Sequence, residues 1–362
     1  MNTLNSSPHP HPIGIIATGS YLPEQIIHND HIAALAGVTD EWIKRKTGIH
    51  QRHRAAPHEA TSDLAAQAAR SALQQAGLHP TDLAYIVVAT STPDHPQPAT
   101  ASIVQHLLHA TNAAAFDINT VCSGFVYALT VMERLLHNQP QHRYGLVIGA
   151  DIYSRILDYA DPKTAILFGD GAGAAILGPV PHHQGLLKTT LTTHGNQHDL
   201  ISVPAGGSRH PATADTVESG RHYFHMDGRA VADFVQTHLP QAIHSLLSTT
   251  GTSPHQITHL IPHQANATLL GKVWPQLNLP HTTLHLTLKH HANTGAASIP
   301  ITLDTINRAN QLHDNDTLIL AAFGGGMNTG TTLLRWTPTH AATHAVDHTP
   351  VGVGAEAEPL RV

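Results

Sequence analysis

The sequence predicts an α/β protein. Short apolar segments typical of buried strands alternate with segments typical of helices along most of the 362 residues. The segments 12–180 and 181–337 carry similar series of elements, which suggests two related halves, although no repeated sequence connects them. A chain of this length can bury a large core, and 41% hydrophobic residues fits a globular protein.

The first half has clear signals for both kinds of element. A strand is expected at 13–18, and a helix at 61–76 has the capping sequence Thr61-Ser62-Asp63 and a glycine after its last turn. Apolar segments 165–168 and 174–177 flank a glycine-rich turn. Apolar runs predict three more strands and a buried helix, at 83–89, 113–116, 145–149 and 124–136 respectively.

The second half begins with a loop-rich stretch from 180 to 221, after which the alternation resumes. Helices are expected at 234–247 and 298–310. The expected strands are 257–262, 283–288 and 317–322. Residues 1–11 are polar and rich in proline and histidine, and 338–362 show no periodicity, so both ends are expected to be disordered.

Composition excludes several classes of function. A net charge of −6 argues against a nucleic-acid-binding protein. A single cysteine excludes an intramolecular disulfide and fits a reducing compartment. The N-terminus has no signal-peptide core, and no apolar run reaches the ~20 residues that span a bilayer, so the expectation is a soluble cytoplasmic protein without membrane contact.

The 33 histidines suggest metal binding, but their distribution does not. They are spread along the whole chain, and the pairs His182-His183 and His290-His291 have no cysteine or carboxylate at ligand spacing. No metal site is therefore predicted.

Basic residues gather at Lys44, Arg45, Lys46, Arg52 and Arg54, in a chain with only 19 lysines and arginines. Such a cluster indicates an anionic ligand or an acidic partner surface. An ordinary solvated face is the alternative.

The cysteine, Cys122, follows a predicted strand and directly precedes the apolar helix at 124–136. At a helix N-terminus, unpaired N–H groups and the helix dipole favour the thiolate, which is the form that attacks carbonyl groups. A small buried hydrophobic residue is the alternative interpretation.

Three further motifs stand where predicted strands end or helices begin. Each has a structural alternative: His263 as a core histidine, Asn293 as a helix cap, and the glycines as a tight turn. Together they supply a nucleophile, two hydrogen-bond donors and a backbone loop that can approach a substrate, as acyl transfer requires. The motifs are His263-Gln264-Ala265-Asn266, Asn293-Thr294-Gly295 and Phe323-Gly324-Gly325-Gly326.

With these motifs in this order, the chain resembles the β-ketoacyl-acyl-carrier-protein synthase III family of the thiolase superfamily over residues 12–337. The resemblance also includes Asp40-Glu41-Trp42-Ile43, Thr47-Gly48-Ile49 and Phe168-Gly169-Asp170-Gly171-Ala172-Gly173. It implies a thiolase-like five-layer αβαβα duplication with two mixed sheets, the nucleophile in residues 12–180 and the histidine and asparagine in 181–337. It also implies a homodimer.

The resemblance implies that Cys122, His263 and Asn293 form a catalytic triad, with backbone N–H groups of Cys122 and Gly325 as the oxyanion hole. Cys122 would be acylated by a thioester, and decarboxylative condensation with a malonyl thioester would follow. No cofactor is bound permanently; the substrates are thioesters of coenzyme A or of the phosphopantetheine of an acyl carrier protein. The lack of a second cysteine favours this reaction over thiolytic cleavage.

The family's substrate-binding positions are partly altered here. Trp42 matches the tryptophan that stacks on the coenzyme A adenine, and Lys46 replaces an arginine near the phosphates. The other arginine of that site falls near Pro162-Lys163. Thr268 stands where an arginine docks the carrier protein, with Lys272 one turn later.

Gln97 lies near the loop that lines the partner's acyl pocket, where an apolar residue is common. A polar or larger acyl group, or an outward-facing Gln97, would fit equally. These departures point to specialised metabolism of the polyketide type rather than to the initiation of fatty-acid synthesis.

Two rival functions use the same fold. One is an acyltransferase that moves the acyl group from Cys122 to an alcohol, amine or thiol without decarboxylation. The other is a non-catalytic subunit or carrier-binding module. Asn293 favours the condensing enzyme over the first, and the joint presence of Cys122, His263 and Asn293 favours it over the second.

Overall fold

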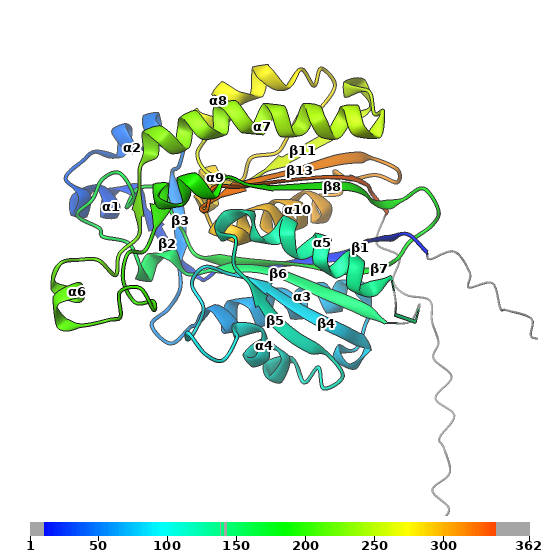
Figure 1. Cartoon of the computed structure of the whole chain (residues 1–362), viewed down its shortest axis with the longest axis horizontal. Helices are drawn as coiled ribbons and strands as arrows, with labels where there is room; N and C mark the ends of the chain where they lie inside the picture. The colour runs from blue at the N-terminus through cyan, green and yellow to red at the C-terminus, as the bar shows by residue number, and fades with distance from the viewer. Residues whose placement is uncertain (1–10, 138, 141–142, 338–362) are drawn as a thin grey trace, which may run out of the picture.

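The computed structural model describes residues 11–137, 139–140 and 143–337 (Figure 1). The two ends expected to be disordered, 1–11 and 338–362, lie outside these residues except for His11. Two five-stranded sheets form the framework. No helix in the described ranges combines the length and apolar character needed to cross a bilayer.

The first sheet has the strand order β1-β7-β6-β4-β5. Strands β6, β4 and β5 run parallel to one another, whereas β7 is antiparallel to both of its neighbours. The strands are β1 (Ile13–Tyr21), β4 (Leu83–Ala89), β5 (Ala114–Ile118), β6 (Tyr144–Asp151) and β7 (Gly171–Pro179).

The second sheet has the order β12-β11-β13-β14-β8 and repeats this pattern of directions. Its first three strands are parallel, and β14 is antiparallel to both neighbours. Because both sheets show the same pattern, the fold is a duplication. The strands are β8 (Gly185–Thr193), β11 (His259–Pro262), β12 (Thr283–Leu284), β13 (Thr317–Gly324) and β14 (Asn328–Arg335).

Helices and sheets alternate in five layers (Figure 1). Helices α3 (Thr61–Ala76) and α4 (Thr100–Leu108) cover the outer face of the first sheet. Helices α5 (Gly124–Leu136) and α10 (Ser298–Arg308) lie between the sheets, and α7 (Gly228–Thr250) and α8 (Ala267–Val273) cover the second. This is the predicted αβαβα arrangement, which confirms the expected fold class.

The remaining elements are short. They are α1 (Asn29–Ala36), α2 (Asp40–Thr47), α6 (Ala214–Glu218), α9 (Leu288–His291), β2 (Gln25–His28), β3 (Gln51–Arg54), β9 (Ile201–Ser202) and β10 (His225–Met226). Of these, α1, α2, α6, β2 and β3 lie at one end of the layers (Figure 1). Short segments of 3-10 helix occur at Pro80–Asp82, Val121–Ser123, Tyr153–Arg155, Gly195–Leu200, Pro254–Gln256, Trp274–Leu277 and Gly295–Ala297.

The composition of each helix matches its layer. Helix α5 lies between two sheets, and its apolar side chains Phe125, Leu129 and Met132 are fully buried there. Helix α3 packs alanines against β1 and β7, which allows a close approach of helix and sheet. Asp63 caps α3 by accepting a hydrogen bond from the Ala60 N–H, so the helix cap is Ala60 rather than Thr61.

Several strands differ from the expectation. Strand β8 lies inside the stretch expected to be a loop, because its alternation of leucine with lysine and threonine is too polar to stand out. Strand β14 had no apolar signal either, since Thr331 and Thr332 are buried polar residues. The segment 165–168 is not a strand, although Phe168 forms an isolated bridge to Asn293.

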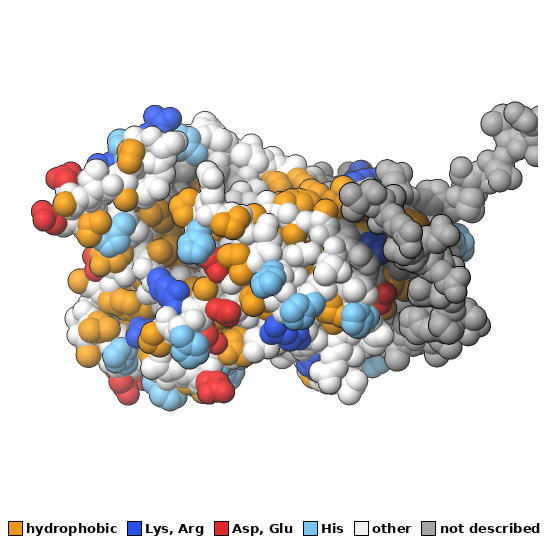
Figure 2. Space-filling view, turned by 90° about the horizontal axis from the view of Figure 1, so that it is seen from below, with side chains coloured by type: hydrophobic (Ala, Val, Ile, Leu, Met, Phe, Trp, Pro, Cys, Tyr) orange, Lys and Arg blue, Asp and Glu red, His pale blue; other side chains and the backbone are white. Residues whose placement is uncertain are grey.

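Histidine side chains are scattered over the face shown in Figure 2 rather than gathered in one place. In the described residues no group of three or more histidine, cysteine, aspartate or glutamate side chains is arranged to hold a metal ion. Burial singles out His259, His263 and His285 from the rest.

One glycine of β6 allows the two halves to meet. A Cβ on Gly149 would lie 2.2 Å from the carbonyl oxygen of Ala296 and 2.7 Å from its carbon. Both are backbone atoms, which cannot yield as a flexible side chain does. The turn from Asn293 to Ala297 is therefore seated directly on strand β6.

We expect Gly149→Ala to lower the free energy of unfolding by about 1–3 kcal/mol, the usual range for overpacking a rigid core. Gly207→Ala is the control, because a Cβ there meets no atom within 4 Å and the φ of Gly207 is ordinary. Urea unfolding followed by circular dichroism would measure both. Equal stability of the two variants would contradict the close contact.

Candidate active site

The site lies where the parallel strands of both sheets end. Thr90–Thr92 follow β4, Cys122 follows β5, and His263 follows β11. The carboxyl ends of parallel strands meet at one edge of a sheet, which is where α/β proteins place their chemistry. Because the halves face each other, both sheets contribute to one pocket, with a volume of ≈ 180 Å³.

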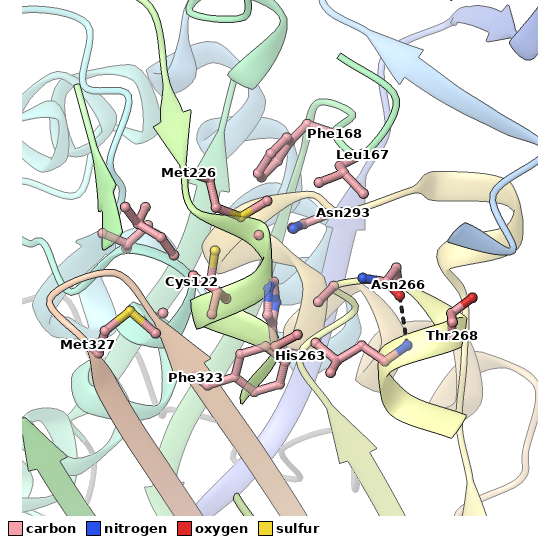
Figure 3. A pocket seen from close by; sticks show the side chains of 18 of the residues that line it. Cys122, Leu167, Phe168, Met226, His263, Asn266, Thr268, Asn293, Phe323 and Met327 are labelled. Atoms are coloured by element: carbon pink, nitrogen blue, oxygen red, sulfur yellow. Dashed lines mark hydrogen bonds between the residues drawn. The ribbon is translucent and has the colours of Figure 1, made fainter. Parts of the chain in front are cut away.

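Cys122, His263 and Asn293 all line this pocket, and Figure 3 shows their side chains around it. Their exposed fractions are 7%, 2% and 5%, so each is accessible only through the pocket. The prediction that these three residues lie together therefore agrees with the geometry.

Cys122 sits in the 3-10 turn that leads into α5. The residue before it, Val121, has a φ of 51°, an uncommon conformation for a β-branched residue that costs free energy. The turn after β13 runs against the same backbone: a Cβ on Gly324 would lie 2.9 Å from the Cys122 nitrogen. Only glycine fits there, which explains the first glycine of the run.

Burial raises the pKa of the Cys122 thiol, and the carboxylate of Asp151 raises it further. A hydrogen bond that the Tyr153 hydroxyl can give to the thiolate, and one from the backbone N–H of Cys122, lower the pKa of the thiol but do not offset burial. The resting sulfur is therefore a thiol. The expectation of a thiolate from the helix end alone was wrong, because desolvation of the charged form outweighs the helix dipole.

His263 is held as a hydrogen-bond donor. Its Nδ1 lies 2.7 Å from the Ser298 hydroxyl, which already accepts from the Gln264 N–H. The Ser298 proton can therefore be given to Nδ1, which leaves the proton of the neutral imidazole on Nε2. Burial lowers the pKa of His263 to about 3, so the ring is neutral at pH 7.

Asn293 is oriented in a similar way. Its Oδ1 accepts a hydrogen bond from the Gly295 N–H at 2.9 Å, so the amide nitrogen is the group free to face the pocket. Its backbone is paired with Leu167 and Gly169 of the neighbouring segment. Two fixed donors from the second half thus face the sulfur from the first.

Apolar side chains form the rest of the pocket, and sequence patterns did not single them out. Phe224 and Met226 come from the stretch between β9 and α7, which has no long regular element. Leu167, Phe168 and Ile201 complete this wall. The one sequence feature that could have indicated this wall is the presence of large apolar residues in a stretch otherwise typical of a loop.

The five predicted substrate-binding residues are divided. Thr268 and Lys272 of α8 line the pocket. Trp42 and Lys46 of α2 do not line it. The Lys46 ammonium lies 5.9 Å from the centroid of the Trp42 ring. Helix α2 contacts α8 through a hydrogen bond from the Thr268 hydroxyl to the Arg45 carbonyl. Gln97 is exposed in the loop after β4 and also lies outside the pocket lining.

The basic cluster does not act as one surface. Arg52 is 3% exposed and donates to Asn29 Oδ1 and to the Ile166 carbonyl, each at 3.1 Å, so it supports the fold. Arg54 packs over the Tyr159 ring, and Lys44 pairs with Asp40. Arg45 and Lys46 are exposed, and Lys46 lies over the Trp42 ring.

A two-sheet fold with a buried cysteine at the start of the helix between the sheets defines the class of thiolase-fold condensing enzymes. The family model of 3-oxoacyl-(acyl-carrier-protein) synthase III matches residues 116–195, and the model of its C-terminal part matches 247–336. A synthase III from Caldanaerobacter subterraneus is 42% identical over 89% of this chain and 97% of its own length. The chain belongs to this family.

Two other similarities refine this placement. The acetoacetyl-coenzyme A synthase NphT7 of a Streptomyces species is 52% identical over 89% of this chain and 98% of its own length. The solved structure of the priming β-ketosynthase of a polyketide biosynthetic pathway matches with a TM-score of 0.84 and 26% identity, over 93% of this chain and all of the other. The chain is accordingly a condensing enzyme.

Burial of neutral His263 makes stability depend on pH. The folded-state pKa of about 3 lies below the unfolded value of ~6.5, so the unfolded state binds the extra proton. The stabilisation is complete above pH 6.5 and is lost as the pH falls towards 3. We expect His263→Gln to weaken the dependence of unfolding free energy on pH by about one proton between pH 6 and 4. Urea unfolding across this range measures the slope, and an unchanged slope would show that His263 titrates normally.

Proposed function

We propose that the chain forms a β-ketoacyl thioester by condensing a short acyl group, carried on Cys122, with a malonyl thioester. The observation that supports this most directly is the convergence of the Cys122 sulfur, the His263 Nε2–H and the free Asn293 amide on one pocket. A nucleophile and two fixed neutral donors are what the two steps of this reaction need.

In the first step, the Cys122 sulfur attacks the carbonyl carbon of an acyl thioester. The carbonyl oxygen becomes an oxyanion, which the N–H groups of Cys122 and Gly325 stabilise, because the β13–β14 turn lies against the Cys122 backbone. The carbon–sulfur bond of the donor then breaks, and acyl-Cys122 remains while the thiol leaves.

In the second step, the thioester carbonyl of the malonyl group accepts hydrogen bonds from His263 and Asn293. Loss of CO₂ leaves an electron pair that delocalises onto this oxygen. Fixed donors aimed there are worth ~3–4 kcal/mol each. Since His263 is neutral, it donates one hydrogen bond without giving up its proton. The carbanion attacks the carbonyl carbon of acyl-Cys122, and the bond from that carbon to sulfur breaks. The product is released, and the Cys122 thiolate takes up a proton from water to regenerate the thiol.

We further propose coenzyme A, rather than a carrier protein, as the usual carrier. Thr268 places no cation where the family docks the carrier protein, and the nearest pocket cation is Lys272. Trp42 and Lys46 lie together on the neighbouring helix α2 and can meet an adenine and a phosphate. The similarity to an acetoacetyl-coenzyme A synthase supports the same choice and a place in specialised biosynthesis.

We also propose a cytoplasmic homodimer. Strand β5 forms the edge of the first sheet, and its Phe116 and Ile118 are only partly buried in one copy of the chain. Pairing with a second copy would satisfy the open edge and cover these side chains. Gln97, exposed in the loop that follows β4, would then face the partner.

We expect an acetyl adduct on Cys122 by intact mass after incubation with acetyl-coenzyme A, and none in Cys122→Ala. Asn293→Ala should keep this adduct while release of labelled CO₂ from malonyl-coenzyme A falls about 100-fold or more. Equal loss of both steps would contradict the role of Asn293. Acyl transfer without CO₂ release would indicate the acyltransferase function instead.

The carrier preference has its own test. Wild-type protein should show a higher kcat/KM with malonyl-coenzyme A than with a malonyl carrier protein. Thr268→Arg should raise kcat/KM for the carrier protein several-fold, because a cation at a rim steers an acidic partner. The matched substitution Thr282→Arg, in the loop before β12 and outside the pocket lining, should not. A wild-type preference for the carrier protein would overturn the proposal.

A further inference from the structure

Asp151 is a fully buried carboxylate next to the nucleophile, and the two steps above do not use it. Its Oδ1 accepts hydrogen bonds from the Ser91 N–H at 2.8 Å and the Ser91 hydroxyl at 3.0 Å. The hydroxyls of Thr90 and Thr92 also donate to Oδ1, and the Ala296 N–H donates to Oδ2. Thr90 and Thr92 each accept from a backbone N–H, which leaves their own protons for Asp151. Burial raises the pKa of Asp151, and the hydrogen bonds from Ala296, Ser91 and Thr92 oppose this rise by stabilising the carboxylate.

Tyr153 connects this carboxylate to the sulfur. Its hydroxyl lies 2.9 Å from the Ser91 hydroxyl and is in hydrogen-bonding contact with the Cys122 thiol. The ring is 1% exposed and stacks on Phe168 with centroids 4.2 Å apart, so the hydroxyl is fixed in place. A continuous chain of hydrogen-bonding groups thus runs from Cys122 through Tyr153 and Ser91 to Asp151.

The direction in which these hydrogen bonds are donated follows from the group at the end of the series, Asp151. Asp151, as a carboxylate, can only accept, so Ser91 donates to it. Tyr153 must then donate to Ser91, and its remaining lone pair can accept from the Cys122 S–H. Every proton points from the sulfur towards the carboxylate, as transfer in that direction requires.

Among the residues that the structure describes, no other titratable group facing the sulfur is free to accept its proton. The titratable groups that face Cys122 are Tyr153 and Asp151 from the β6 end and His263 from the β11 end. His263 has its Nδ1 occupied by Ser298 and its proton on Nε2. Burial also lowers the pKa of His263 to about 3, which makes the ring a poor base.

Resting on the proposed acylation of Cys122, we propose that Tyr153 and Ser91 relay the Cys122 proton to Asp151 when the sulfur attacks. The S–H bond breaks and a proton passes to Tyr153, whose own proton passes to Ser91, whose proton in turn forms an O–H bond on Asp151. All three hydrogen bonds reverse, and Tyr153 now donates to the thiolate. The buried negative charge moves from Asp151 to the sulfur without changing in amount.

The same relay balances the end of the acylation step. When the donor's carbon–sulfur bond breaks, the leaving thiolate occupies the place beside Tyr153 that the Cys122 thiol held. The proton returns from Asp151 through Ser91 and Tyr153 to this thiolate. The products are acyl-Cys122, a free thiol and the original carboxylate, so neither a metal nor an external base enters the balance.

The test measures how readily Cys122 forms its thiolate as the pH changes. Cys122 is the only cysteine of the chain, so the rate of alkylation by iodoacetamide reports on this sulfur alone. Tyr153→Phe keeps the ring that packs on Phe168 and removes only the hydroxyl. We expect its alkylation profile to move upward by about one pH unit or more, because a hydrogen bond to an ionised group is lost.

Ser91→Ala distinguishes a relay from a simple donor. This variant leaves Tyr153 beside the sulfur but interrupts the path to Asp151, and we expect a shift in the same direction. Tyr159→Phe is the matched control, since Tyr159 belongs to the same aromatic cluster and its hydroxyl contacts the Ser154 carbonyl and Arg54 rather than Cys122. Its profile should equal that of the wild type.

An unchanged profile in Tyr153→Phe, or a shift in Tyr153→Phe but not in Ser91→Ala, would overturn the relay. Single-turnover acylation by acetyl-coenzyme A should slow at least 10-fold in both relay variants at pH 7 and recover in part at higher pH. Failure of the wild type to form any acyl adduct would refute the proposed function itself, and is thus distinguishable from failure of the relay.

Discussion

The buried carboxylate of Asp151 is the interaction on which the site depends. It stands at the end of β6 and accepts hydrogen bonds from the segment after β4 and from Ala296 of the second half. A charge without water is stable only when such donors surround it, so the three segments are fixed relative to one another. Asn293, Tyr153 and the Cys122 turn take their places from this arrangement.

The electrostatics of the pocket follow from burial, which disfavours the charged forms of its side chains. Burial keeps His263 neutral and raises the pKa values of the Cys122 thiol and of Asp151, while hydrogen-bond donors stabilise the Asp151 carboxylate. A second negative charge beside the first would be costly, which is why forming the thiolate and protonating the carboxylate belong together. The neutral donors His263 and Asn293 can then stabilise an oxyanion without opposing it by repulsion.

The sequence was most informative where local patterns determine structure. The helix at 124–136 and the strand at 83–89 have the predicted limits, since both contain long apolar runs whose side chains are mostly buried. The motifs of Cys122, His263 and Asn293 indicated the site because each directly follows or precedes such an element. Strand β8 could not be found in this way, since its pairing with β14 and not its composition makes it a strand.

The hydrogen-bond network next to the Cys122 sulfur could not be predicted from local sequence patterns either. Ser91, Asp151 and Tyr153 are ordinary residues in their own segments, and only the parallel pairing of β4 with β6 brings them together. Local patterns also do not reveal that Arg52 supports the fold, because its hydrogen-bond partners Asn29 and Ile166 are distant from it in the chain. Residues whose role depends on tertiary contacts can be identified only once the fold is known.

The close approach of Gly324 to the backbone of Cys122 has an evolutionary consequence. The nucleophile is positioned by main-chain atoms that leave no room for a side chain at position 324, so the sequence of this part of the site can hardly change. The wall built from Phe224 and Met226 has no such restriction, because it belongs to a stretch with little regular structure. Descendants of this chain would therefore diverge in the acyl groups they accept long before they diverge in the bond they make.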